Sequence, residues 1–144
     1  MTGATQPEVR IFIGAEPDIA EAMRRVRRMA ETIGFSPVDV SYLATAATEL
    51  ASNLLIHADG GTMEIYVLPQ NSGIELVTID SGPGIPDIER AMQDGFSTSG
   101  GLGCGLPGVK RLMDGIEIDS QVGQGTRISA WKSKQGFTSC RAPH

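Results

Sequence analysis

Asp80-Ser81-Gly82-Pro83-Gly84-Ile85 is the turn from which the fold of this chain can be predicted. The apolar residues Leu76 to Ile79 precede it and indicate a buried strand, so Asp80 lies where that strand ends. Apolar neighbours leave such a carboxylate partly desolvated, which strengthens a hydrogen bond from a donor such as the amino group of adenine. The glycines let a flat base approach the backbone. An ordinary turn would have the same composition, because Asp, Gly and Pro are all common in turns.

A helix expected before this strand carries three polar residues on one edge. Ser36-Pro37 supplies an N-cap and a first-turn proline, and Asp59-Gly60-Gly61 ends the helix after about His57. Glu49, Asn53 and His57 are spaced four apart and project together along the edge of the apolar stripe. Glutamate can deprotonate a nucleophile or water, and an asparagine carbonyl oxygen is a hard ligand suited to Mg²⁺. An ordinary polar helix edge would show the same spacing.

A glycine-rich run follows the turn, Gly100-Gly101-Leu102-Gly103-Cys104-Gly105-Leu106. It leads directly into a helix expected from Leu106 to Met113, and free backbone N–H groups at a helix start attract phosphate oxygens. The run is neither a Walker loop nor a dinucleotide fingerprint, because the lysine motif and a directly preceding strand are both missing. A flexible linker is the alternative, and the uninterrupted helix that follows favours a phosphate loop.

The remaining pattern predicts an α/β (α+β) two-layer sandwich, with helices on one face of a mixed, mostly antiparallel sheet. Strands are expected at residues 9–13, 62–68, 74–79, 116–120 and 126–131, and helices at about 17–33, 36–57, 87–92 and 106–113. Residues 1–144 are expected to form a single domain with a core at about 8–132. We expect 133–144 to be a flexible tail.

Composition narrows the class of protein. Hydrophobic residues make up 40% and charged residues 20%, which is ordinary for a soluble globular protein. No apolar run approaches the roughly 20 residues needed to cross a bilayer, and the start lacks the features of a signal peptide, so we expect a cytoplasmic protein without a membrane partner. A net charge of −5 argues against nucleic acid as the main partner. Cys104 and Cys140 form neither a disulfide framework nor a zinc pattern.

One basic cluster opposes the acidic average, Arg24-Arg25-Val26-Arg27-Arg28 on the first expected helix. The cluster has two interpretations, a solvated helix face or a docking patch for an acidic partner. Helical spacing does not turn all four arginines the same way, so the sequence leaves both open.

The segments described above, in this order, resemble the GHKL ATPase superfamily, whose nucleotide pocket (the Bergerat fold) is built from an N box, a G1 box and a G2 box. Glu49-Leu50-Ala51-Ser52-Asn53 is similar to the N box, residues 80–84 to the G1 box, and Gly101 to Leu106 to the G2 box. Gly125-Thr126 is similar to a further Gly-Thr near the base. The resemblance spans about residues 8–132.

This likeness implies binding of ATP and Mg²⁺, with Glu49 as the catalytic acid/base, Asn53 as the Mg²⁺ ligand and Asp80 in contact with adenine. His57 is expected at the pocket rim because it follows Asn53 by one helical turn. Residues 94–100, the expected lid, contain no Arg or Lys, so the cation that would meet the γ-phosphate is left unassigned, with Lys110 as one candidate. The full set of nucleotide contacts expected is Asn53, His57, Asp80, Gly82, Gly84, Ile85, Gly101, Leu102, Gly103, Cys104, Gly105, Leu106, Lys110 and Thr126.

Within the superfamily the chain resembles the small bacterial anti-sigma factor and switch-protein serine kinases, most closely the RsbT-type stressosome kinases. The resemblance to the RsbT type is carried by the sequence of residues 103–114. That resemblance implies an ATP-dependent serine/threonine kinase acting on a STAS-domain partner in bacterial stress-response partner switching. A downstream phosphatase or sigma-factor regulator is a further candidate partner. Two alternatives stay open: an anti-sigma factor that acts as a nucleotide-dependent binding switch, and a detached histidine-kinase catalytic domain. The second is disfavoured because the chain leaves no room for a phosphoacceptor helix pair.

Overall fold

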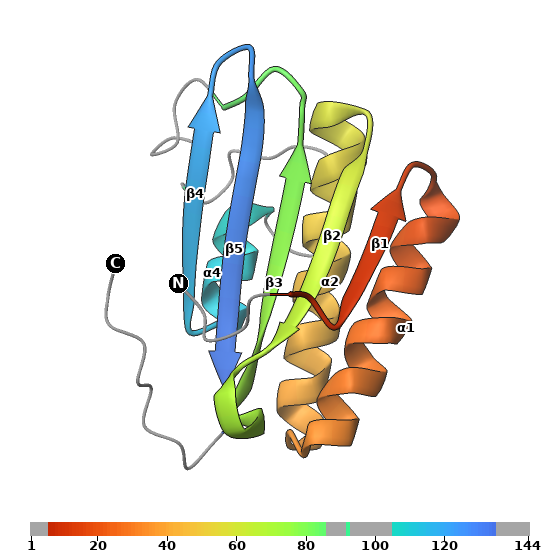
Figure 1. The fold of residues 1–144 in the computed structure, drawn as a ribbon, viewed down its shortest axis with the longest axis vertical. Helices are drawn as coiled ribbons and strands as arrows, with labels where there is room; N and C mark the ends of the chain where they lie inside the picture. Colours follow the sequence, from red (N-terminus) through yellow and green to blue (C-terminus); the bar gives the residue numbers. More distant parts are fainter. Residues whose placement is uncertain (1–5, 86–91, 93–104, 135–144) are drawn as a thin grey trace.

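The protein folds into one five-stranded sheet covered by helices, as seen in a computed structural model that describes residues 6–85, 92 and 105–134 (Figure 1). The strands are β1 (Val9–Ile13), β2 (Gly61–Val67), β3 (Gly73–Asp80), β4 (Gly115–Gln121) and β5 (Gly125–Ser133). The helices are α1 (Glu16–Ile33), α2 (Pro37–Ala58), α4 (Leu106–Leu112) and the short 3₁₀ turn η1 (Pro69–Asn71). Their bounds agree with the sequence expectation to within about two residues, and the helix expected at 87–92 lies almost wholly outside the described residues.

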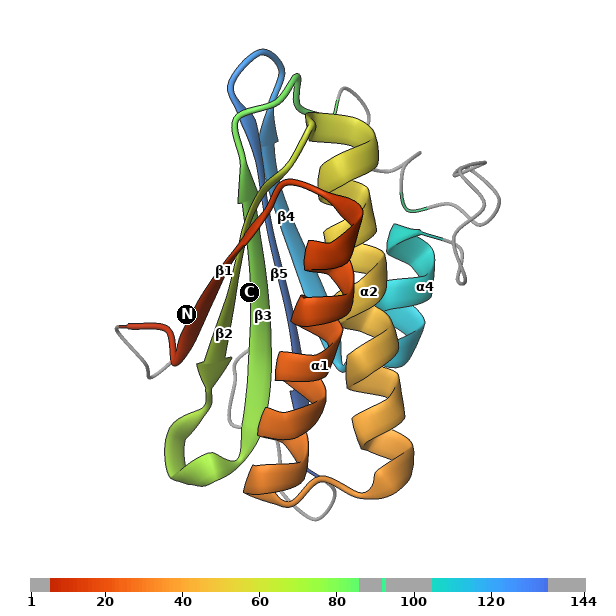
Figure 2. The ribbon, with the colours of Figure 1, turned by 90° about the vertical axis from the view of Figure 1, so that its right-hand side faces the viewer.

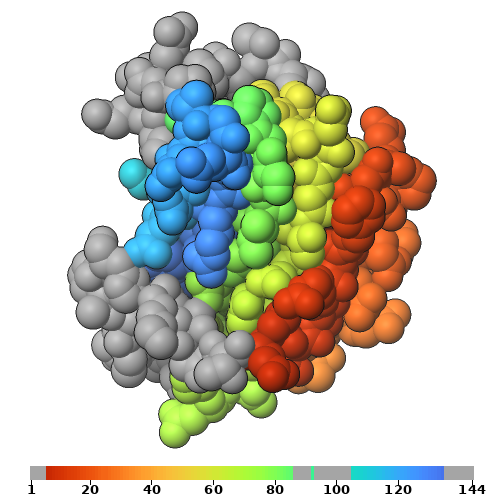
Figure 3. Space-filling model, turned by 45° about the horizontal axis from the view of Figure 1, so that its top comes forward, coloured from red at the N-terminus to blue at the C-terminus, as the bar shows by residue number. Residues whose placement is uncertain are grey.

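The two layers are separate in a side view, where α1, α2 and α4 lie together on one face of the sheet (Figure 2). The strand order is β1-β2-β3-β5-β4, and Figure 3 shows the strands side by side on the face away from the helices. This confirms the predicted two-layer α/β fold. One detail differs from the prediction: each of the four pairings is antiparallel, so the described sheet has no mixed part. The last strand, β5, enters between β3 and β4 and runs opposite to both.

The helix ends follow the local signals in the sequence. At the start of α2 the Ser36 hydroxyl accepts a hydrogen bond of 3.2 Å from the Asp39 N–H, and Pro37 occupies the first turn. At the start of α1 the Asp18 carboxylate accepts from the N–H groups of Gly14 and Ala15. These caps satisfy backbone donors that an α-helix leaves without a partner.

The core lies between the sheet and the helices, with α2 at its centre. Its largest fully buried side chains come from both layers: Ile13, Val26, Leu43, Leu50, Leu54, Met63, Ile65, Ile74, Leu76, Val109 and Ile128. Full burial of one such side chain contributes about 1.5–3 kcal/mol. This packing fixes α2 and the ends of β3 and β5 relative to one another.

Two lysines at the end of β5 hold the ends of two helices. Lys132 Nζ donates a hydrogen bond of 3.0 Å to the carbonyl of Leu112, the last residue of α4. Lys134 Nζ donates one of 2.8 Å to the carbonyl of Ile33, the last residue of α1. A cation at a helix C-terminus satisfies an unpaired carbonyl and interacts favourably with the helix dipole. The far end of β5 therefore fastens two helices to the sheet.

The four arginines of the basic cluster are all exposed on α1. Arg24 and Arg25 pair with Glu21 on the same helix, at 2.8 and 3.5 Å. The hydrogen bond from Arg24 lowers the pKa of the Glu21 carboxyl below its ordinary value. Pairing of two arginines within their own helix fits the solvated-face interpretation, and a docking role stays a prediction.

A polar network lies on the sheet face away from the helices. Glu64 on β2 is buried, its Oε2 accepts from Arg10 Nε at 3.0 Å, and its Oε1 accepts from the Tyr66 hydroxyl at 2.9 Å. Burial of the Tyr66 phenol, together with this bond to an anionic acceptor, raises its pKa above the ordinary value of 10.0. The folded state therefore favours the protonated phenol.

A pH dependence follows from that shift. Stability gained from Tyr66 is fully present below the pKa of the unfolded phenol, about 10, and is lost as the pH rises through the folded value. The chain has two tyrosines, so in a Tyr42→Phe variant the ultraviolet titration of phenolate reports Tyr66 alone. We expect a midpoint above that of the same variant in urea, and a lower midpoint after Glu64→Gln. Equal midpoints in buffer and urea would contradict the shift.

Within the described ranges, 6–85 and 105–134 with residue 92, no helix is long and apolar enough to cross a bilayer.

Candidate functional site

Asp80 is the last residue of β3 and carries a half-buried carboxylate. Its Oδ1 accepts a hydrogen bond of 2.8 Å from the backbone N–H of Gly82, which fixes the orientation of the carboxyl group. Across the sheet, Asp80 is the direct register partner of Thr126 on β5. An oriented, partly desolvated carboxylate at a strand end is suited to accept a hydrogen bond from a ligand.

The turn after Asp80 is held from two sides. On one side it touches the end of α2, since a Cβ placed on Gly82 would lie 2.8 Å from the Cβ of Ala58. On the other side it lies on the β4–β5 turn: the Pro83 carbonyl accepts from the Gly123 N–H at 2.8 Å, and a Cβ on Gly84 would lie 2.5 Å from the Gln121 carbonyl oxygen. This is more restraint than a plain surface turn has, and it places the turn between α2 and the sheet end.

Two hydroxyl groups extend this restraint. Ser120 Oγ accepts a hydrogen bond of 2.7 Å from the Ile85 N–H, at the end of the turn. It also lies 2.8 Å from Thr126 Oγ1 and 3.3 Å from the Gly125 carbonyl oxygen. The predicted residues Ile85 and Thr126 are therefore joined through one side chain, that of Ser120.

Gly125 lies against the backbone of Asp80. Its φ is +110°, and a Cβ there would lie 2.1 Å from the Asp80 carbonyl oxygen. Neither the left-handed backbone nor the space admits a side chain. The Gly-Thr pair in the sequence thus has a structural reason: glycine brings β5 close enough for Thr126 to stand beside Asp80.

The three polar residues of α2 become more exposed along the helix. Glu49 is buried with 5% of its surface exposed, Asn53 is half-buried, and His57 is exposed. The series ends at the last turn of α2, beside which Gly82 packs. The expected row on one helix edge is present, with the carboxylate deepest. That burial distinguishes Glu49 from a residue on an ordinary polar helix edge.

The start of α4 supplies the next predicted residues. Gly105 has a φ of +68° and precedes the helix, and Leu106 is buried in the core. Lys110 is exposed in the last turn of this seven-residue helix. Because α4 packs against α2, the end of the glycine-rich run lies in the same helical layer as Glu49, Asn53 and His57, which we call the α2 row. Contact of Lys110 with a phosphate stays a prediction.

Four predicted glycine-run residues, Gly101, Leu102, Gly103 and Cys104, lie outside the described residues, as does the expected lid at 94–100. The structure therefore brings together Asp80, Gly82, Gly84, Ile85 and Thr126 at one end of the sheet. It places Glu49, Asn53 and His57 on the helix that ends there. Their contacts with a nucleotide stay predictions.

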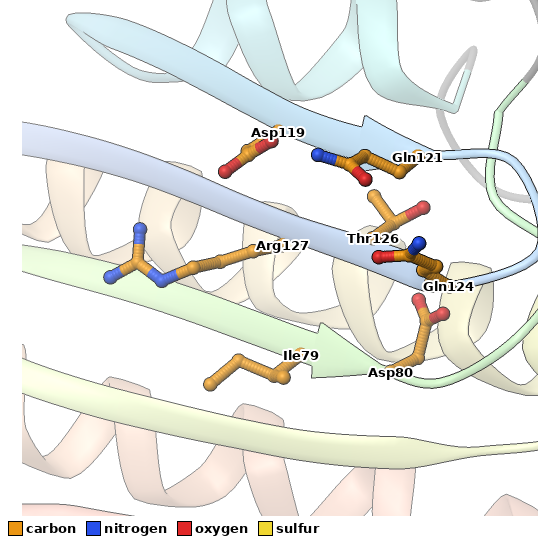
Figure 4. Close-up of a pocket in the computed structure, with 8 residues that line it drawn as sticks. Ile79, Asp80, Asp119, Gln121, Gln124, Thr126 and Arg127 are labelled. Carbon is orange, nitrogen blue, oxygen red and sulfur yellow. The ribbon is translucent and has the colours of Figure 1, made fainter.

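A shallow hollow opens at this end of the sheet (Figure 4). It is lined by Ile79, Asp80, Asp119, Gln121, Gln124, Gly125, Thr126 and Arg127. The hollow shares only Asp80 and Thr126 with the predicted nucleotide contacts. Ile79, Arg127 and Asp119 are register partners on the opposite face from Asp80. The hollow is therefore lined from both faces of the sheet at its end, and it differs from the expected nucleotide cleft.

The sequence did not predict Ser120, nor the polar residues of the hollow other than Asp80 and Thr126, which are Asp119, Gln121, Gln124 and Arg127. The signal that could have found Ser120 was the alternation of side chains in residues 116–120 and 126–131, because it separates the two faces of the hairpin formed by β4 and β5. It could place Ser120 on the same face as Thr126 only once the hairpin register was known. The hairpin was predicted, but the register was not.

The side chains at this site can be compared with the ligands that Mg²⁺ usually takes in proteins. Within the described ranges no group of three or more His, Cys, Asp or Glu side chains could hold a metal ion. Mg²⁺ commonly takes only one or two protein ligands, with water and substrate phosphates completing its shell, so a dedicated cage is not required. A half-buried Asn53 amide one turn from the Glu49 carboxylate is compatible with such a site.

Comparison with known proteins supports a family assignment. Residues 14–132 match the model of the histidine kinase-like ATPase domain. The chain is 47% identical over 124 residues to the serine/threonine-protein kinase RsbT of Bacillus subtilis, covering 85% of this chain and 93% of RsbT. It is 30% identical over 117 residues to the anti-sigma F factor of Geobacillus stearothermophilus, covering 75% of this chain and 80% of that protein.

Solved structures share the fold at low sequence identity. A Mycobacterium tuberculosis structure of RsbU and RsbW domains aligns with a TM-score of 0.62 and 15% identity, covering 88% of this chain and 32% of that one. The SiaB–SiaC complex of Pseudomonas aeruginosa aligns with a TM-score of 0.59 and 11% identity, covering 88% and 90%. The family match over residues 14–132 and the 47% identity to RsbT show that the chain belongs to the histidine kinase-like (GHKL-type) ATPase domain family.

Proposed function

We propose that this protein is an ATP-dependent serine/threonine-protein kinase that phosphorylates a STAS-domain regulator in a bacterial stress-response partner-switching pathway. The observation that carries the proposal is the α2 row, in which a buried Glu49 precedes Asn53 on the helix that ends beside Asp80. The 47% identity to a serine/threonine-protein kinase over 85% of the chain supports the reaction class. The match of residues 14–132 to a family of ATPase domains supports the use of a nucleotide.

The residues have distinct roles in this proposal. Asp80 accepts a hydrogen bond from the adenine amino group, and Thr126 beside it contacts the base. Asn53 offers its amide oxygen to Mg²⁺, which when bound would neutralise phosphate charge. The run from Gly101 to Leu106, with Lys110, surrounds the phosphates. Phosphoryl transfer needs mainly positioning and charge neutralisation, so this small set is sufficient.

The chemical step assigned to Glu49 is proton removal. A serine or threonine hydroxyl oxygen of the partner forms a bond to the γ-phosphorus, and the bond from that phosphorus to the bridging oxygen of ADP breaks. The hydroxyl proton goes to the Glu49 carboxylate.

The reaction is tested by incubating the protein with labelled ATP and Mg²⁺ and a STAS-domain protein from the same cell. We expect label on a serine or threonine of the STAS protein, located by phosphosite mapping. Correctly folded protein that binds ATP but transfers no phosphate to any STAS protein of that cell would refute the kinase proposal.

The anti-sigma F factor relatives favour a second candidate function, a binding switch in which the nucleotide sets the affinity for a partner. The same pocket would serve both functions. In a switch, partner capture changes between ATP and ADP while no phosphate is transferred. Capture assays with both nucleotides, run beside the transfer assay, separate the two.

An Asp80→Asn variant tests the adenine contact. The amide presents an N–H group where the carboxylate presented an acceptor, so we expect the Kd for ATP to rise by about 10- to 100-fold. Isothermal titration calorimetry measures this. Asp119→Asn is the matched control, because Asp119 lines the same hollow from the opposite face and should leave the Kd unchanged. An unchanged Kd in Asp80→Asn would remove Asp80 from the adenine site.

A further inference from the structure

Three polar residues stand in one row across the end of the sheet. Asp80 on β3 is the register partner of Thr126 on β5, and Thr126 is the register partner of Ser120 on β4. Direct register partners lie on the same face of a sheet, which here is the helix face. Asp80 and Thr126 reach the proposed nucleotide site, whereas Ser120 lies behind Thr126 at the edge strand.

The hydrogen bonds of Ser120 can be assigned from its chemistry. A serine hydroxyl has one hydrogen to donate and two lone pairs that accept. One lone pair takes the Ile85 N–H at 2.7 Å. Two oxygens compete for the single hydrogen, Thr126 Oγ1 at 2.8 Å and the Gly125 carbonyl at 3.3 Å. Hydrogen bonds from O–H to oxygen span about 2.5–3.0 Å, so the contact with Thr126 is the one of ordinary length.

We propose that Ser120 is a positioning residue that donates its hydrogen to Thr126 and thereby leaves the Thr126 hydrogen free to be donated toward the nucleotide base. With one lone pair of Thr126 occupied by Ser120, the threonine hydrogen is turned away from Ser120. It is then free for an acceptor on the ligand. The same serine holds the turn after Asp80 through the Ile85 N–H, so one side chain sets both neighbours of the base.

The consequence is a preference between purines. Asp80 is an acceptor, and Thr126 beside it becomes a donor. Adenine presents a matching pair on its Watson–Crick edge, an amino donor next to a ring nitrogen acceptor. Guanine presents the reverse, a carbonyl acceptor next to a ring N–H donor. This arrangement disfavours the reversed pattern, because the guanine carbonyl would face the Asp80 carboxylate with no hydrogen between them, and the Thr126 hydrogen would find no acceptor on the guanine ring N–H. This inference rests on the proposed function, since it assumes that a nucleotide base lies at Asp80.

The experiment measures the Kd of ATP and of GTP by calorimetry for the wild type, Ser120→Ala and Ser120→Thr. In Ser120→Ala the Thr126 hydroxyl can rotate to donate or accept, so we expect the Kd for ATP to rise by about three- to tenfold. The Kd for GTP should change little or fall. The preference for ATP over GTP should therefore decrease. Ser120→Thr keeps the hydroxyl and should restore the preference.

The matched control is Ser129→Ala. Ser129 is a buried serine on β5 whose hydroxyl donates to Glu75, away from the site. It should lower the urea midpoint while leaving the preference for ATP unchanged. A purely structural role for Ser120 would weaken ATP and GTP binding equally, and that result would overturn the proposal.

A second variant keeps the proposal testable if Ser120→Ala does not fold. Thr126→Val leaves the bond between Ser120 and Ile85 in place and removes only the proposed donor. It should decrease the preference for ATP to a similar extent, and an unchanged preference would overturn the proposal. Where both single variants fold, the double variant should lose no more than either, because the two residues act on the same contact. A wild-type protein that binds neither ATP nor GTP would instead overturn the proposed function.

Discussion

Replacing Glu49 with glutamine should lower the rate of phosphoryl transfer to the STAS partner by about 10²- to 10⁴-fold, the range typical of a lost general base. Glutamine has nearly the same shape but cannot take the hydroxyl proton. Because Glu49 does not contact the base in the proposed mechanism, the Kd for ATP should stay within about threefold of wild type. Single-turnover transfer of labelled phosphate, together with calorimetry, measures both quantities.

The matched control for this variant is Glu31→Gln, which removes one negative charge from an exposed position on α1. It should transfer phosphate at the wild-type rate. A Glu49→Gln variant that also transfers at the wild-type rate would remove Glu49 from the catalytic role. Glu49→Ala separates the two candidate functions: a kinase loses transfer, whereas a pure binding switch keeps nucleotide-dependent partner capture.

Replacing Gly125 with alanine should destabilise the fold by roughly 2–4 kcal/mol. The added Cβ would lie 2.1 Å from the Asp80 carbonyl oxygen, and the backbone there has a φ of +110°. Relief of this overlap requires β5 to move away from the end of β3. That movement would separate Thr126 from Asp80, so the Kd for ATP should rise as well. Urea unfolding measures the free energy, and calorimetry at a temperature where the variant is folded measures the binding.

Gly123→Ala is the control that separates space from backbone conformation. Gly123 also has a positive φ, +83°, but a Cβ there would meet nothing within 4 Å. It should therefore show only the cost of a left-handed backbone, about 1–2 kcal/mol, and unchanged ATP binding. Equal destabilisation by the two variants would contradict the close contact between Gly125 and Asp80.

Local signals in the sequence predicted the elements well. Ser36-Pro37 and Asp59-Gly60-Gly61 mark the two ends of a helix that the structure confirms, and the alternation around Ile11 and Ile128 marks strands. These features depend on caps, backbone preferences and period, which a few neighbouring residues determine.

What the sequence did not predict depends on pairing between distant segments. Nothing local to residues 125–133 indicates that this strand enters between β3 and β4, or that its first residues face Asp80. The register that brings Ser120 behind Thr126 follows from the length of the β4–β5 turn. For this reason the sequence motifs identified Asp80 and Thr126 separately. The Ser120 hydroxyl group, which joins Thr126 to Ile85, was found only in the structure.

The place of β5 in the sheet has a consequence for biosynthesis. In the described part of the chain β4 pairs with β5 alone, so a nascent chain that has reached residue 124 has no strand for β4 to join. Until β5 is made, β3 exposes one edge, and the lysines that fasten the ends of α1 and α4 are absent. Synthesis of β5 therefore completes the sheet and supplies the lysines that bind the ends of α1 and α4. It also adds Thr126 to the row formed by Asp80, Thr126 and Ser120. If the row beside Asp80 binds ATP as proposed, a ribosome-bound chain would acquire that binding only after residues 125–134 have left the exit tunnel.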